Sequence, residues 1–79
     1  MNIKSIKGTR SAIEVEIDNK QIIITGELTT TPVFYADINS IKHWKPPYEN
    51  EIITATERNE IIQAIERESK NKKVPIIFD

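Results

Sequence analysis

The segment spanning residues 11–25 restricts the possible fold more than any other part of this sequence. Residues 13–17 read Ile-Glu-Val-Glu-Ile, so apolar and acidic residues alternate strictly. Successive side chains of a β-strand point to opposite faces, and this alternation therefore predicts a half-buried strand over residues 11–17. One face of the strand turns isoleucine and valine toward a core, and the other face carries Glu14 and Glu16.

A tight turn and a second strand complete a hairpin. The turn is formed by Asp18-Asn19 or by Asn19-Lys20, and both Asp and Asn tolerate the positive φ that a two-residue turn requires. Residues 21–25, Gln-Ile-Ile-Ile-Thr, form the second strand. Either turn places the first and last isoleucines of this strand on the apolar side of the hairpin. The middle one, Ile23, points to the opposite face and needs cover there.

A helix is predicted over residues 55–70. Thr54 is a favoured N-cap residue and Glu57 has the position that completes a capping box. Isoleucines then recur at helical spacing on one face: Ile61, Ile62 and Ile65. Arg58 falls within the same face, so we expect its stem to be buried and its guanidinium group to meet a carboxylate. The candidates for that carboxylate are Asp37, Glu49 and Glu51.

Weaker signals fill the rest of the chain. Further strands are expected at residues 3–6, 33–38 and 74–78. Residues 41–44 could add a short edge strand, which Pro46 and Pro47 would end because proline donates no hydrogen bond to a ladder.

The chain of 79 residues has room for one domain, residues 1–79. Its composition, 38% hydrophobic and 29% charged, is typical of a globular protein. The predicted fold class is α+β: a twisted antiparallel sheet of about four to six strands with one helix packed on a face, in the order β-β-β-β-α-β.

The charge pattern bears on possible partners. A net charge of −1 and a pI near 5.8 give no overall attraction to nucleic acid. Residues 42–45, Lys-His-Trp-Lys, could stack on a single strand, but Glu49 and Glu51 would repel its phosphates. Residues 1–8 lack the apolar core of a signal peptide, and no apolar run approaches the ~20 residues that span a membrane. We expect a cytoplasmic protein that binds neither nucleic acid nor membrane.

Few residues could support catalysis. The sequence has no Cys and no glycine-rich phosphate loop, and His43 is its only imidazole. We therefore expect no catalytic residues, no bound metal and no cofactor. The alternative is a small metal-dependent or acid/base enzyme that uses His43 with Asp37 or Glu49.

Other residues are candidates for binding a partner. Glu14, Glu16 and Asp18 form an acidic strand face, which is either simply solvated or complementary to a basic partner. Tyr35 and Tyr48 are aromatic candidates for the same surface, because tyrosine is enriched in binding hot spots.

Residues 40–48 hold the only Trp of the chain together with Pro46, Pro47 and Tyr48. A rigid loop of this kind can contact a partner at low entropic cost. Trp44 is instead expected to plug the end of a thin sheet–helix core. For Tyr48, partner contact and a purely structural role both stay open.

Several of these segments together carry a resemblance to a known family. They are residues 13–20, 33–37, 41–48, 53–65 and 76–78. The most specific is Trp-x-Pro-Pro at residues 44–47, followed by Glu57-Arg58 and the isoleucine-rich helix. In this order they resemble immunity protein family seventy-four of bacterial polymorphic toxin systems, over nearly the whole chain after residue 12.

The resemblance implies a protein that binds a cognate toxin domain in the toxin-producing cell and blocks it stoichiometrically. It implies no catalytic motif. Asn19 stands where many relatives are expected to have Gly, and Asn tolerates the same backbone conformation. A third reading is an interaction adaptor unrelated to toxins that dimerises through an open sheet edge.

Overall fold

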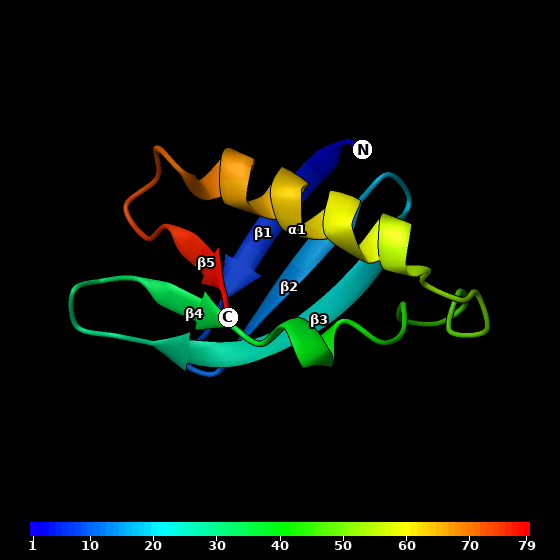
Figure 1. The fold of residues 1–79 in the computed structure, drawn as a ribbon, viewed down its shortest axis with the longest axis horizontal. Coiled ribbons are helices and arrows are strands. Elements are labelled where there is room, and N and C mark those ends of the chain that lie inside the picture. The colour runs from blue at the N-terminus through cyan, green and yellow to red at the C-terminus, as the bar shows by residue number, and fades with distance from the viewer.

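The computed structural model covers residues 1–79 and contains one five-stranded sheet with its strands in chain order. The strands are β1 (Ile3–Gly8), β2 (Ala12–Ile17), β3 (Lys20–Leu28), β4 (Phe34–Ala36) and β5 (Ile76–Phe78). Helix α1 (Ala55–Ser69) lies across one face of the sheet, and a short 3-10 helix, η1 (Ile38–Ser40), follows β4 (Figure 1). The α+β class and the order β-β-β-β-α-β are confirmed.

The sheet is mixed rather than wholly antiparallel. Strands β1 to β4 pair antiparallel with their neighbours, whereas β4 and β5 run parallel. The reason is the connection: the chain leaves β4, passes through α1 and returns in the same direction beside β4. Parallel neighbours require such a crossover, and the helix provides it.

The predicted hairpin is confirmed. Val15 pairs with Ile22 across β2 and β3, and both side chains are fully buried. Asp18 in the turn has a φ of 56°, the left-handed conformation that Asp tolerates. Strand β3 continues to Leu28, beyond the predicted end at residue 25.

The helix start is also confirmed. The side chain of Thr54 accepts a hydrogen bond from the N–H of Glu57 at 3.1 Å, as an N-cap should. Ile61 and Ile65 are completely buried against the sheet, and the helix ends at Ser69, one residue before the predicted end.

Residues 37–45 lie along the edge of β3 that β4 leaves free. The Thr25 N–H donates to the hydroxyl of Ser40 at 3.0 Å, and the Lys45 N–H donates to the carbonyl of Gln21 at 2.8 Å. Residues 41–44 form no strand, so that prediction is wrong. Trp44 is only 3% exposed and belongs to the core, as expected.

The outer edge of β5 is closed by side chains of the helix. The Ile76 N–H donates to the hydroxyl of Ser69 at 2.9 Å, and the Phe78 N–H donates to a carboxylate oxygen of Glu66 at 3.1 Å. These bonds satisfy amides that would otherwise be free on an edge strand. In Figure 1, β5 accordingly lies between α1 and β4.

Gly26 allows β3 and β4 to approach closely. Its partner on β4 is Ala36. A Cβ atom at position 26 would lie 2.2 Å from the carbonyl oxygen of Tyr35 and 2.7 Å from a ring carbon of Phe34. Backbone atoms cannot move away without breaking the ladder, so only glycine fits at this position.

Gly26→Ala is expected to lower the free energy of unfolding by about 2–3 kcal/mol, because overpacking forces the two strands apart. The matched control is Gly8→Ala, whose new Cβ would meet Ile13 at 3.4 Å, an ordinary contact. Urea unfolding followed by circular dichroism measures both. Equal midpoints for the two variants would contradict the close approach.

Ser69→Ala is expected to cost about 1–3 kcal/mol, because the buried Ile76 N–H loses its acceptor. Ser5→Ala is the control, since the structure gives the Ser5 side chain no hydrogen bond, and its unfolding midpoint should match that of the wild type. A Ser69→Ala protein as stable as the control would show that the helix does not seal the edge of β5.

Candidate partner-binding surface

The face of the sheet opposite α1 is not covered by any element of the chain. Because α1 packs on the side of Val15 and Ile22, the alternate residues point the other way. We call this surface the open face. Its residues on the strands are Ser5, Lys7, Ala12, Glu14, Glu16, Gln21, Ile23, Thr25, Glu27, Tyr35 and Ile77.

Pairing across the strands arranges these residues in rows. Ile23 lies directly opposite Glu14. Tyr35 lies opposite Glu27 on one side and Ile77 on the other. Residues directly opposite each other share a face and lie in reach of one another. The open face thus combines apolar and aromatic side chains with carboxylates.

Three large apolar side chains of the open face are exposed to solvent. The exposed fractions are 46% for Ile23, 41% for Tyr35 and 44% for Ile77. The cover that the sequence pattern requires for Ile23 is therefore not supplied by this chain. Exposed apolar residues gathered on one face, rather than scattered singly, indicate an interaction surface.

Glu14 is engaged within the molecule. The Lys45 ammonium group lies 2.9 Å from its carboxylate, and both side chains are more than a third exposed. Since the backbone of Lys45 is bonded at the far edge of β3, its side chain crosses β3 on the open face. The hydrogen bond from Lys45, and then its charge, lower the pKa of Glu14.

The other predicted acidic residues make no ion pair. Glu16 points outward from β2, and Asp18 occupies the exposed hairpin turn. The predicted acidic patch thus keeps two unpaired carboxylates, while Glu14 is neutralised locally. Glu27 is a third carboxylate without an ion pair, and it lies on the open face beside Tyr35. Glu27 was not among the binding residues predicted from the sequence, although it stands in period-two alternation with Ile23.

Tyr48 is not on the open face. Its ring is partly buried against the core, and the Lys20 ammonium group lies 5.5 Å from its centre. The same ammonium group lies 5.4 Å from the Trp44 ring and forms an ion pair with Glu51, which raises the pKa of Lys20. Lys20 therefore ties the loop that follows Trp44 to the hairpin.

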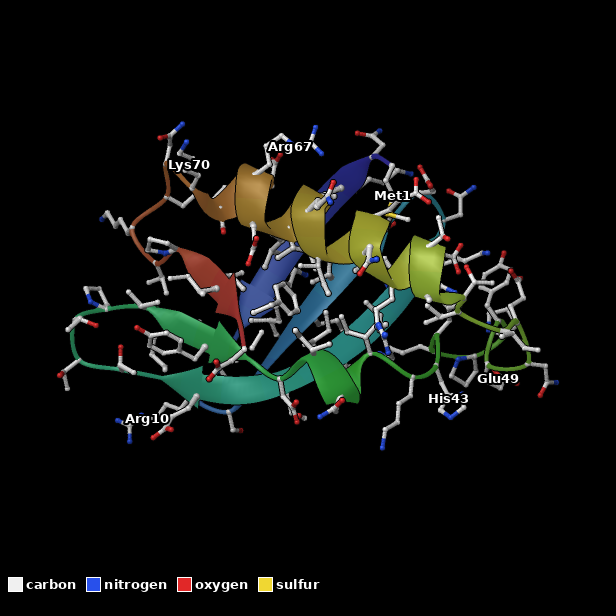
Figure 2. All side chains as sticks on the ribbon, in the orientation of Figure 1. Met1, Arg10, His43, Glu49, Arg67 and Lys70 are labelled. Atoms are coloured by element: carbon white, nitrogen blue, oxygen red, sulfur yellow. The ribbon has the colours of Figure 1, made fainter.

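The residues of the alternative enzyme site are not gathered into a metal site. No three His, Cys, Asp or Glu side chains lie close enough together to hold an ion. Asp37 caps η1 by accepting a hydrogen bond from the Asn39 N–H at 2.9 Å. His43 and Glu49 are both exposed, and Figure 2 shows them at one end of the molecule.

Arg58 does not meet the expected carboxylate. Its Nε atom is buried without a hydrogen-bond partner. Two of the three candidate partners are used elsewhere, since Asp37 caps η1 and Glu51 pairs with Lys20. The prediction of a buried ion pair at Arg58 is wrong.

The structure is thus a small α+β domain whose sheet is packed against α1 on one face and exposed to solvent on the other. Comparison with family models gives a match to Immunity protein 74 over residues 5–79. The chain belongs to this family, and the resemblance noted from the sequence is confirmed. Searches of curated proteins and of solved structures found no match. Neither α1 nor η1 has the length and apolar character of a membrane-spanning helix.

Lys45→Met is expected to raise the pKa of Glu14 toward the ordinary value of a glutamate, because its hydrogen bond and opposite charge are lost. The folded-state pKa is lowered in the wild type. The pair therefore stabilises the fold above the unfolded-state pKa, and this contribution disappears as the pH falls through the folded-state pKa. Carboxyl ¹³C NMR titration measures the shift. An unchanged Glu14 pKa would contradict the observed pair.

Proposed function

We propose that this protein neutralises a cognate polymorphic toxin by binding it stoichiometrically, without catalysis, in the cytoplasm of the cell that makes the toxin. Membership in the Immunity protein 74 family over residues 5–79 carries this proposal. The protein acts by occupying a surface of the toxin, and it changes no bond itself.

The open face supplies the contact with the toxin. Tyr35 lies on β4 in a row between Glu27 on β3 and Ile77 on β5. Tyrosine contributes a large contact area with few rotatable bonds, which suits a hot spot. Burying Ile23 and Ile77 in the complex removes apolar surface from water, which favours association.

The charges of this surface select a basic partner. Glu16, Glu27 and Asp18 are free of ion pairs within the chain, so they are available to lysine or arginine side chains of the toxin. Glu14 joins them when a toxin cation replaces Lys45. Opposite charge accelerates encounter and excludes partners of the wrong sign. Tyr48 contributes indirectly, because it helps to hold the loop beside Lys20.

The sheet is a rigid platform for such binding. Helix α1 buries the opposite face, and hydrogen bonds hold β3 along both edges. A surface that is ordered before the partner arrives loses little conformational entropy on association.

Tyr35→Ala is expected to weaken the complex with the toxin encoded beside this gene by about 30-fold, the loss typical of a hot spot. Calorimetry with an inactivated toxin measures the affinity and the stoichiometry. Gln63→Ala, on the exposed side of α1, is the control and should bind like the wild type. Equal urea midpoints confirm that both variants fold.

Co-expression with active toxin provides the cellular test. Wild-type protein and the Gln63→Ala variant should protect the cells, and the Tyr35→Ala variant should protect them poorly. Failure of the wild type to form a complex or to protect would overturn the proposed function. A complex unaffected by Tyr35→Ala would remove the open face as the binding surface.

A further inference from the structure

A pocket opens at the end of the molecule where α1 finishes. Its volume is about 480 Å³, and it lies among the turn between β1 and β2, the end of β3 and the loop after α1. Its apolar lining includes Ile6, Leu28, Phe34 and Val74. Protein interiors are normally close-packed, so the apolar side chains that line a hollow of this size lack neighbours on one side.

Leu28 is one of the apolar side chains that the pocket leaves partly exposed. It pairs with Phe34 at the end of β3 and points to the side of the sheet that α1 covers, yet it is 38% exposed. The helix ends before it can cover this part of the sheet. The apolar surface around Leu28 is therefore open to an apolar group from outside.

The rim of the pocket is basic. Arg10 approaches it from the turn between β1 and β2, and Lys72 and Lys73 approach it from the loop after α1. None of the three forms an ion pair, and no Asp or Glu lines the pocket. Cations near the end of a helix complement its dipole, which accounts for the lysines but not for Arg10.

The rim of the pocket is positively charged, although the chain as a whole carries a net charge of −1. Figure 2 shows Arg10 at the end of the molecule opposite to Glu49. A ligand of this pocket must therefore satisfy two requirements together. It presents an apolar group to the lining and a negative charge to the rim.

We infer that the pocket receives a toxin segment in which an apolar side chain is flanked by carboxylates. The apolar side chain packs against Leu28 and Phe34, and the carboxylates pair with Arg10 and the two lysines. A guanidinium group can bind a carboxylate with two parallel hydrogen bonds, so Arg10 sets the orientation. This inference rests on the proposed function and adds a contact that is separate from the open face and opposite in charge.

The test compares two variants with equal changes in charge. Arg10→Glu/Lys72→Glu/Lys73→Glu reverses the rim, and we expect its affinity for the inactivated toxin to fall about tenfold or more, since each reversed charge repels the acidic segment. The effect should diminish at high salt, because these charges are exposed.

The matched control is Lys4→Glu/Lys42→Glu/Arg67→Glu, which reverses exposed cations that do not line the pocket. It should bind the toxin within about twofold of the wild type. Equal losses in the two variants would show that only net charge matters and would overturn the inference. An unchanged affinity of the rim variant would also overturn it, while leaving the proposed function intact.

Sodium octanoate tests the pocket without the toxin, because it joins a carboxylate to an apolar chain. Titration of the ¹⁵N-labelled protein should shift the amide signals of Gly8, Leu28 and Val74 in the wild type and in the control variant, but not in the rim variant. No shift in the wild type, or equal shifts in all three proteins, would overturn the inference. Loss of toxin binding by the wild type would instead refute the proposed function.

Discussion

The whole structure depends on β3 being hydrogen-bonded along both edges. One edge pairs with β2, and the other pairs with β4 near Gly26 and with the segment that contains Lys45 near Gln21. The close approach at Gly26 is what lets β4 join the sheet. Strand β5 pairs with β4, and side chains of α1 in turn bind β5. The positions of β5 and α1, and with them the enclosure of the core, therefore depend on the close approach of β3 and β4 at Gly26.

A thin core makes this arrangement asymmetric. A chain of 79 residues has one helix to cover a five-stranded sheet, and small domains bury a limited part of their surface. The helix seals the face lined by Ile22 and Ile24 and leaves Tyr35 and Ile77 on the opposite face in solvent. The open face and the basic-rimmed pocket are both uncovered for the same reason, because one helix is too short to cover the whole sheet. A bound partner would cover both.

Local chemistry explains which parts of the fold could be predicted. The alternation that contains Val15 and the N-cap at Thr54 are decided by neighbouring residues, so the hairpin and the helix start are readable in the sequence. The bond from Ser69 to β5, the crossing of Lys45 over β3 and the missing partner of Arg58 depend on distant segments that only the folded chain brings together. Tyr35 was a predicted site residue because tyrosine is enriched in binding hot spots, whereas its row with Ile77 depends on the parallel pairing of β4 and β5.

Isoleucine methyl NMR can establish whether the open face contacts the toxin, as we propose. In a complex of ¹³C-methyl-labelled protein with unlabelled, inactivated toxin, a soluble paramagnetic agent reports which methyl groups remain in solvent. We expect Ile23 and Ile77, both exposed in the free protein, to become protected, while the buried Ile61 is unchanged and the exposed Ile52 stays accessible. A stoichiometric complex in which Ile23 and Ile77 remain as accessible as in the free protein would contradict it.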